Sequence, residues 1–220
     1  MLTLENARAW YKVNDPVHGF GHIQRVYALC ERIGRSEGAD MEVLLTAALL
    51  HDARGSHPGR GSRNDHHLLS AEFAGEILTE EGLDAERICA VQHCIRAHRF
   101  RKEELPETLE AKVLFDADKL DVLGAIGVVR ALAYAFQVNQ PAFSEPSSRF
   151  RQTGEKEPGE PHSAYHEYLF KLKNISATLL TPTARAIAKE RQELLNSFFD
   201  KLALEMRGET KQTKFEEINK

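Results

Sequence analysis

The sequence predicts an all-α fold. Apolar residues recur at helical spacing along most of the chain, and candidate cap residues precede several of these runs. No stretch alternates between apolar and polar residues as a half-buried strand does. With 220 residues, of which 42% are hydrophobic and 28% charged, the composition is that of an ordinary globular protein with a substantial core. We therefore expect one helical domain over residues 1–208, followed by a polar, frayed tail over 209–220.

The first half of the chain contains the first group of predicted helices. The residues four, seven and eleven places after His22 are apolar, which defines one side of a helix. Asp40 is a candidate N-cap for a helix over 41–51. Helical periodicity resumes over 66–80, and Asp84 can cap the helix that follows. Helices of this kind need partners for their apolar sides, so we expect a bundle.

The second half is predicted to contain a long helix, a long loop and two closing helices. Helical periodicity runs through 109–137. Segment 139–161 holds four prolines among glycines and charged residues, which predicts a long loop or a partly disordered insertion. Helix returns near Tyr165, and Thr181 followed by a proline predicts the start of a closing helix over 182–203.

Charge and composition limit the partners and the location. The net charge of −4 supplies no overall basic field, so nucleic acid is not expected as the main partner. The first 20 residues are interrupted by charges, and no apolar run reaches the roughly 18 residues of a membrane span. The three cysteines form no CxxC pair and lie in predicted helices, as buried free thiols do. We expect a cytoplasmic protein. Whether it forms a homo-oligomer stays open.

A histidine and an aspartate, His51 and Asp52, stand at the end of the apolar run 44–50. Buried imidazole and carboxylate groups need partners, and one divalent cation can serve both. A lone pair of this kind is far more often solvated or hydrogen-bonded within the protein. Here His22 lies 29 residues upstream of the pair and Asp118 lies 66 residues downstream of Asp52. The four residues, in this order, favour a metal site.

Segment 116–121 offers three carboxylates. Asp118 and Asp121 are three residues apart and share a helix face, whereas Asp116 lies about 200° around the helix from Asp118. We therefore choose Asp118 as a metal ligand and give Asp121 the role of orienting a ligand histidine or water. Asp116 is expected to be a solvated or capping carboxylate.

These features together resemble the HD-domain superfamily of metal-dependent phosphohydrolases, whose pattern is a histidine, a His-Asp pair and a distal aspartate. The resemblance covers most of the chain. The sequences of four segments, 21–26, 66–71, 116–121 and 185–191, resemble those of the YedJ-like branch of small bacterial HD hydrolases. The resemblance implies a single HD-domain helical bundle with one long loop. Carried over residue by residue, it implies the metal ligands His22, His51, Asp52 and Asp118.

The resemblance also implies hydrolysis of a phosphate ester or anhydride, with a small nucleotide as substrate, by metal-activated water. Monoester phosphatase, pyrophosphohydrolase and phosphodiesterase activities are all compatible with it. Mixed nitrogen and oxygen ligands suit Mn²⁺, Fe²⁺, Co²⁺, Ni²⁺ or Zn²⁺ better than Mg²⁺, although Mg²⁺ is frequent in the superfamily. Asp52 is expected to hold the metal and to help orient the water.

One departure concerns the general base. HD enzymes that hydrolyse guanosine alarmones carry acidic residues shortly after the His-Asp pair, whereas here Ala53, Arg54 and Gly55 follow it. That activity is therefore disfavoured. Asp121 as the base, or ionisation of the water by the metal alone, both stay open.

Four further residues are candidates for substrate binding. Arg25 stands one helical turn beyond His22, where it can clamp a phosphate or form a surface salt bridge. Lys119 can reach over the pocket or point away from it. His66 and His98 are either core histidines or ligands of a second metal or of the substrate phosphate. Loop 139–161 could fold over this pocket.

Two alternatives lie outside hydrolysis. Some HD-fold proteins bind two irons and act as oxygenases, and His66 and His98 could supply the additional ligands. The other alternative is a non-catalytic metal-binding module for sensing or assembly. The intact set of four ligands argues against the second alternative.

Overall fold

The computed structural model describes residues 2–11, 19–54, 65–99 and 104–210. Within these ranges every regular element is a helix, so the predicted all-α fold is confirmed. The predicted tail lies largely outside the described residues. The α-helices are α1 (Leu4–Ala7), α2 (Phe20–Glu37), α3 (Met41–Leu50), α4 (His66–Glu80), α5 (Ala85–Ala97), α6 (Leu109–Leu120), α7 (Gly124–Gln137), α8 (Ser148–Thr153), α9 (Ala164–Phe170) and α10 (Pro182–Met206). Two short 3₁₀ helices cover Arg8–Trp10 and Leu172–Thr178.

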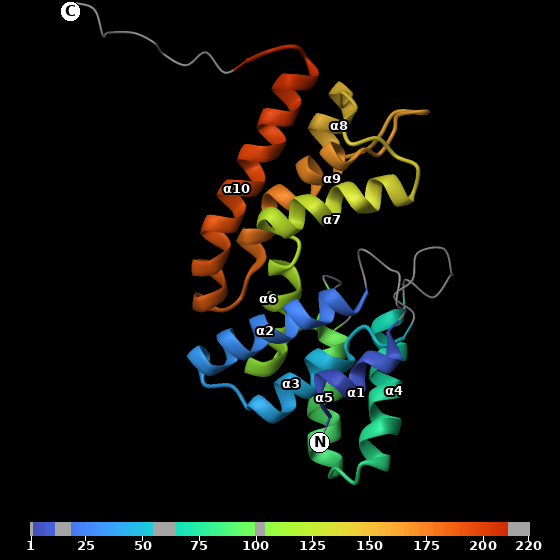
Figure 1. Cartoon of the computed structure of the whole chain (residues 1–220), viewed down its shortest axis with the longest axis vertical. Helices are drawn as coiled ribbons and strands as arrows, with labels where there is room; N and C mark the ends of the chain where they lie inside the picture. The colour runs from blue at the N-terminus through green and yellow to red at the C-terminus, as the bar shows by residue number, and fades with distance from the viewer. Residues whose placement is uncertain (1, 12–18, 55–64, 100–103, 211–220) are drawn as a thin grey trace, which may run out of the picture.

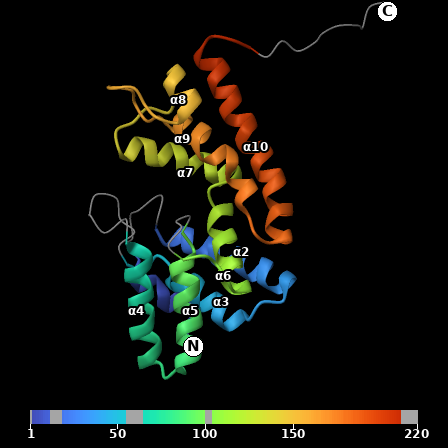
Figure 2. The same ribbon diagram turned by 180° about the vertical axis from the view of Figure 1, so that it is seen from behind.

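The helices form two groups that are joined by α6. Helices α1 to α5 gather at one end, α7 to α10 gather at the other, and α6 runs between them (Figure 1). The same arrangement is seen from behind, where α8 and α9 lie beside α7 and α10 (Figure 2). Helix α2 packs on α3 and α6, α4 packs on α5, and α10 packs on α7.

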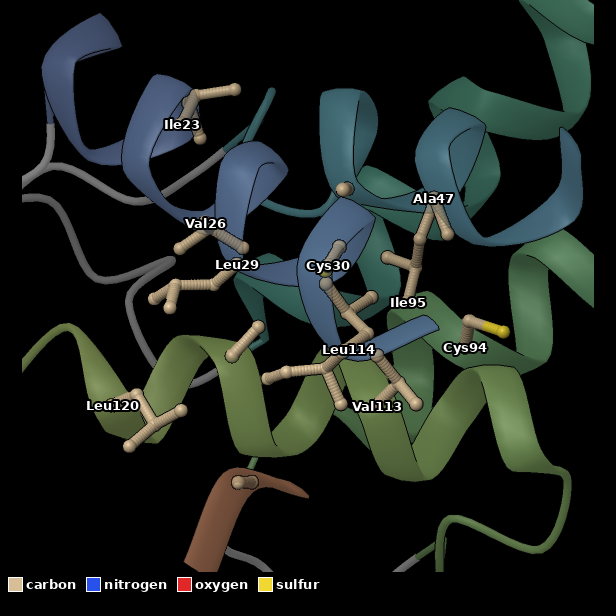
Figure 3. Close-up of a cluster of buried hydrophobic side chains, with 14 of the residues drawn as sticks. Ile23, Val26, Leu29, Cys30, Ala47, Cys94, Ile95, Val113, Leu114 and Leu120 are labelled. Carbon is tan, nitrogen blue, oxygen red and sulfur yellow. The ribbon is translucent and has the colours of Figure 1, made fainter. Parts of the chain in front are cut away.

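The core of the first group lies between α2, α3, α5 and α6. Figure 3 shows Leu29 and Cys30 of α2 facing Leu114 of α6, with Ile95 of α5 beside them. Cys30, Leu114 and Ile95 are fully buried. The apolar side that the spacing after His22 predicts for α2 is therefore the side that enters this core.

Local capping explains why the helices begin where the sequence predicts. The Asp40 carboxylate accepts hydrogen bonds from the backbone N–H groups of Glu42 and Val43, at 3.0 and 3.2 Å. The Asp84 carboxylate caps α5 in the same way, and Thr181 caps α10, which has a proline in its first turn. The predictions of these three starts are confirmed.

The prediction of a single helix over 109–137 is wrong. The chain breaks after Leu120, and α6 and α7 meet at an angle of 68°. Gly124 adopts a left-handed φ of 69°, where a side chain would be strained, and an added Cβ would lie 3.1 Å from a side-chain carbon of Arg191 on α10. Apolar periodicity continues through this turn, so it gave no signal of the break. Among the described residues, no single helix is long and apolar enough to span a membrane, and α6 and α7 reach the required length and composition only when taken together.

Segment 139–161 is also more ordered than predicted. It contains α8, whose N-cap Ser147 accepts a hydrogen bond from the Phe150 N–H at 3.0 Å. Glu160 accepts bonds from the backbone N–H and the hydroxyl of Ser147, at 2.7 and 2.8 Å, and ion-pairs with the buried His166 at 3.0 Å. The segment packs at the α7–α10 end of the molecule and not over the His-Asp pair, a placement that the sequence leaves open (Figures 1 and 2).

Two smaller expectations are also settled by burial. Cys30 and Cys94 are buried as predicted, but Cys89 is exposed. Asp116 is capping rather than solvated, because its fully buried carboxylate accepts bonds from the N–H groups of Leu180 and Thr181 at 2.8 and 2.7 Å. It thereby fixes the start of α10 to α6.

Candidate metal centre

Four predicted ligands meet where α2, α3 and α6 converge. His22 lies in the first turn of α2, His51 and Asp52 follow the last residue of α3, and Asp118 lies in α6. The two Nε2 atoms of His22 and His51 are 3.3 Å apart, and His22 Nε2 lies 3.4 Å from Asp118 Oδ1 and 3.7 Å from Asp52 Oδ2. The structure thus brings together residues that are 96 positions apart in the chain, the number separating 22 and 118.

The hydrogen bonds of the two histidines fix which ring nitrogen faces the centre. His51 donates from Nδ1 to the carbonyl oxygen of Ala48 at 2.9 Å, and His22 donates from Nδ1 to Asp121 Oδ2 at 2.7 Å. In a neutral imidazole, the other nitrogen then carries a lone pair. With both rings neutral, the two Nε2 lone pairs face each other at 3.3 Å, and a cation held between them, a proton or a metal ion, removes the repulsion.

This donor set fits a divalent transition metal. Ligand atoms about 2.0–2.2 Å from one cation lie roughly 3–3.5 Å from each other in tetrahedral or octahedral arrangements. The atoms of His22, His51 and Asp118 lie within 4.8 Å of one another, and two of their separations are 3.3 and 3.4 Å. Two imidazoles and a carboxylate are ligands that Mn²⁺, Fe²⁺, Co²⁺, Ni²⁺ and Zn²⁺ share.

A second group of donors adjoins the first. His66 Nε2, in the first turn of α4, lies 3.2 Å from Asp52 Oδ1, and His98 Nε2, just after α5, lies 3.8 Å from the same oxygen. His98 Nδ1 donates to the carbonyl oxygen of Ile95 at 2.6 Å, so its Nε2 is free to accept. Asp52 thus lies between the two groups. Both groups could hold a metal ion. The sequence predicts that His98 is either a core histidine or a residue of the pocket, and it is both: it is buried and bonded to a carbonyl oxygen, and it also faces the site.

The charge states of these groups suit cation binding. Burial lowers the pKa of His51, and it lowers that of His98 to about 3, so both rings are neutral at physiological pH. Burial opposes the ionisation of Asp52 and Asp118, yet their surroundings hold the pKa of each below its usual range. The hydrogen bond from His66 acts on Asp52, and the positive charge of Lys119 acts on Asp118.

Lys119 reaches the site rather than pointing away from it. Its Nζ lies 2.8 Å from Asp118 Oδ2 and donates to the carbonyl oxygen of His98 at 3.2 Å. The ammonium also lies 4.8 Å from the ring centre of Phe115. A positive charge is therefore held at the rim of the centre, beside the carboxylate predicted to bind metal.

Asp121 is held by three donors. In addition to His22, it accepts bonds from Arg25 Nε at 2.6 Å and from Arg25 Nη2 at 3.0 Å, and it forms a short contact with Arg130 Nη1. Burial opposes its ionisation, but the bonds from His22 and Arg25 bring the pKa of Asp121 down to about 2. These contacts favour the predicted role of orienting a histidine over that of a general base, because so weak a base takes up protons poorly.

Arg130 is not among the residues that the sequence predicts for this site. It lies in α7 and its side chain is 10% exposed, although its partner belongs to the turn after α6. One signal was available: Arg130 is the single charged residue among 124–137, a helix that is otherwise apolar and small apart from its final glutamine. A lone buried arginine requires a partner. Arg54, which follows the His-Asp pair in the sequence, turns instead to Phe73, with its guanidinium carbon 3.6 Å from the ring centre.

The chain is similar to several known proteins. The family model for the HD domain matches residues 19–123. YpgQ of Bacillus subtilis is 29% identical over 195 residues, covering 87% of this chain and 85% of YpgQ. The crystal structure of YpgQ in complex with ADP matches with a TM-score of 0.71, over 94% of this chain and 99% of that one.

Two other solved structures are similarly close. One, from Lactobacillus plantarum, has a TM-score of 0.72 at 27% identity and covers 94% of this chain and 95% of its own. The other is described as a predicted HD superfamily hydrolase from an uncultured Thermotogales bacterium. It has a TM-score of 0.62 at 27% identity and covers 92% of this chain and 90% of its own.

Proposed function

We propose that this chain, whose residues 19–123 match the family model for the HD domain, is a metal-dependent phosphohydrolase. The proposed reaction is hydrolysis of a phosphate ester or anhydride of a small nucleotide. The observation that carries the proposal is the convergence of three donor atoms: His22 Nε2 lies 3.3 Å from His51 Nε2 and 3.4 Å from Asp118 Oδ1. An arrangement of this kind is stable once a cation is shared between the donors.

The proposed ligands are His22, His51, Asp52 and Asp118, with a first-row transition metal as cofactor. A divalent cation, when bound, supplies a Lewis acid for a phosphoryl oxygen and lowers the pKa of water. The chain's own residues hold the geometry: Asp121 orients the His22 ring, and Ala48 orients His51. Lys119 contributes positive charge at the rim of the centre.

Arg25 is proposed to contact the substrate phosphate. Its side chain is 35% exposed, so its Nε and Nη2, which bind Asp121, can exchange that partner for an incoming anion. Guanidinium groups match phosphate geometry and stay charged throughout the physiological range. Lys119 contacts Asp118 and Arg25 contacts Asp121, so both cations are available to stabilise charge that develops on a phosphoryl group.

The nucleotide part of the proposal draws on YpgQ, which was crystallised with ADP and is 29% identical to this chain. The bond that is cleaved is left to experiment, because phosphatase, pyrophosphohydrolase and phosphodiesterase reactions need the same donors. Placement in the YedJ-like branch and a cytoplasmic location remain proposals, as does the extent of the hydrolase domain over residues 1–208.

The test begins with metal-free protein, to which Mn²⁺, Mg²⁺, Co²⁺, Ni²⁺, Zn²⁺ and Fe²⁺ are added singly. Nucleoside mono-, di- and triphosphates and a generic phosphodiester are screened, and both phosphate and pyrophosphate are measured. Asp52→Ala tests the centre, and Glu193→Gln, an exposed carboxylate on α10, is the matched control. We expect metal-dependent release that Asp52→Ala abolishes and Glu193→Gln retains. No release with any metal, from protein that binds metal, would overturn the proposal.

The second donor group favours one alternative function. Asp52, His66 and His98 could hold a second metal beside the first, as the di-iron oxygenases of this fold do. Protein loaded with iron in air would then give the electron paramagnetic resonance signal of a mixed-valence pair and consume oxygen. Phosphate release with one bound metal per chain, and no such signal, would exclude this alternative.

A further inference from the structure

Three donors share the Asp121 carboxylate, but they do not bind it in the same way. Oδ2 receives the Nδ1–H of His22 at 2.7 Å and contacts Arg130 Nη1, whereas Oδ1 receives Arg25 Nε at 2.6 Å. Arg25 reaches Oδ2 only with its second nitrogen, at 3.0 Å. The oxygen that orients the His22 ring is therefore the oxygen that Arg130 holds.

The two arginines also differ in burial. The side chain of Arg25 is 35% exposed and that of Arg130 is 10% exposed. Arg130 Nε is buried and forms no hydrogen bond with the described residues. A desolvated guanidinium keeps its remaining partner, because water cannot replace it, whereas a half-exposed one can exchange its partner for solvent or ligand.

We infer that Arg130 is a positioning residue, which fixes Asp121 and through it the metal-facing ring of His22, while Arg25 is free to exchange Asp121 for an anion. The inference about Arg25 rests on the proposed function; the inference about Arg130 needs only metal binding. Arg130 comes from α7, whereas the predicted ligands come from α2, α6 and the residues after α3. It therefore connects α7 to the candidate metal centre.

The position of Arg130 supports this role in two further ways. Its Nη1 also lies 3.4 Å from the backbone carbonyl oxygen of Asp121, so it holds both the backbone and the side chain of the turn after α6. It lies 3.1 Å from His22 Nδ1 as well. Both nitrogens are donors, so they share the Asp121 oxygen instead of bonding each other, and the guanidinium borders the ring on that side.

The test compares Arg130→Gln, Arg130→Lys and Arg25→Gln with the unmodified protein. The dissociation constant for Co²⁺ is measured in the absence of substrate, together with the visible absorption of bound Co²⁺, which reports ligand geometry. We expect Arg130→Gln to weaken Co²⁺ binding about 10- to 100-fold, as loss of a group that orients a ligand does. Arg130→Lys should recover part of that loss. Arg25→Gln should change Co²⁺ affinity less than about threefold and raise KM for the phosphorylated substrate more than it lowers kcat.

Controls separate positioning from a loss of folding. Arg32→Gln removes an exposed positive charge from the same helix as His22 and should leave Co²⁺ affinity unchanged. Circular dichroism checks that each variant is helical at the assay temperature. If Arg130 acts through Asp121, the double variant Arg130→Gln/Asp121→Asn should bind Co²⁺ no more weakly than Asp121→Asn alone.

The outcomes are distinct from those of the activity screen. Co²⁺ affinity within threefold of the unmodified protein in Arg130→Gln, or fully additive losses in the double variant, would overturn the role of Arg130. An Arg25→Gln variant that loses Co²⁺ affinity as strongly as Arg130→Gln would overturn the division between the two arginines. A protein without phosphohydrolase activity whose Co²⁺ affinity still depends on Arg130 would refute the proposed function alone.

Discussion

Replacing Asp116 with alanine should destabilise the protein without weakening metal binding, although Asp116 lies only two residues from Asp118. Its carboxylate accepts three bonds, from the N–H groups of Leu180 and Thr181 and from the Thr181 hydroxyl, at 2.8, 2.7 and 2.7 Å. The hydroxyl can turn to another acceptor, but the two backbone donors cannot. Alanine therefore leaves two N–H groups at the start of α10 without their partner.

The magnitude follows from the burial of those two donors. A buried donor without a partner costs about 1–3 kcal/mol. Leu180 N is partly buried and Thr181 N is fully buried, which gives about 1 and about 2 kcal/mol. Burial raises the pKa of Asp116, so desolvation of the carboxylate offsets part of what its hydrogen bonds contribute. We expect a net loss of about 2–3 kcal/mol in the free energy of unfolding.

Urea denaturation followed by circular dichroism at 222 nm measures this loss. Asp116→Asn keeps one acceptor oxygen and should cost roughly half as much. Glu193→Ala removes an exposed carboxylate from α10 and should stay within about 0.5 kcal/mol of the unmodified protein. Co²⁺ affinity of Asp116→Asn should be unchanged, because its side chain faces α10 and not His22.

A loss below about 1 kcal/mol for Asp116→Ala, with an unchanged denaturant slope, would refute the reasoning. It would mean that the two N–H groups find other acceptors, so that the start of α10 does not depend on α6. A fall in Co²⁺ affinity in folded Asp116→Asn would refute the assignment of the two aspartates to separate tasks.

Three further predictions concern the turn between α6 and α7, the loss of stability at acid pH, and the stabilisation of the fold by a bound metal. Gly124→Ala should cost about 1–2 kcal/mol in unfolding free energy, because φ is 69° and a Cβ would lie 3.1 Å from a side-chain carbon of α10. Gly82→Ala is the control for the backbone strain alone, because φ is 79° there and an added Cβ would meet no heavy atom within 4 Å. If the two variants lose the same unfolding free energy, the contact with Arg191 contributes nothing. The backbone N–H of Ser147 is the main cause that brings the pKa of Glu160 down to about 2, against an ordinary value of 4.5. Because this pKa is depressed in the folded state, the stabilisation by Glu160 is present above pH 4.5 and is lost as the pH falls through about 2. Glu160→Gln should therefore show a shallower loss of stability between these pH values, and an unchanged acid titration of the circular dichroism signal would contradict it. Mn²⁺ or Co²⁺ at 100 times its dissociation constant should raise the unfolding free energy by about 2.7 kcal/mol, reversibly with a chelator. Asp118→Ala should lose most of this gain, and a full gain in that variant would exclude Asp118 as a ligand.

Helix starts could be predicted from the sequence because their causes are local. The carboxylates of Asp40 and Asp84 bind N–H groups no more than three residues away, and Thr181 does the same before a proline. The break between α6 and α7 could not be predicted, because it depends on the approach of Arg191, whose side chain donates to the Leu120 carbonyl oxygen at 2.8 Å. Periodicity reports which side of a helix is apolar, and that side continues across the turn.

The candidate site also has features that the sequence predicts and features that only the fold determines. The sequence by itself determined the donor types and their order along the chain, His22, the His-Asp pair and Asp118, because helical spacing and the need of buried polar groups for partners can be read from it. Only the tertiary structure decided that Asp121 faces His22, that Asp116 faces α10, and that Arg130 contacts Asp121. The physical reason is the range of the interactions: Asp121 meets His22 across 99 positions of the chain, and no local pattern encodes which distant donor a buried carboxylate will face.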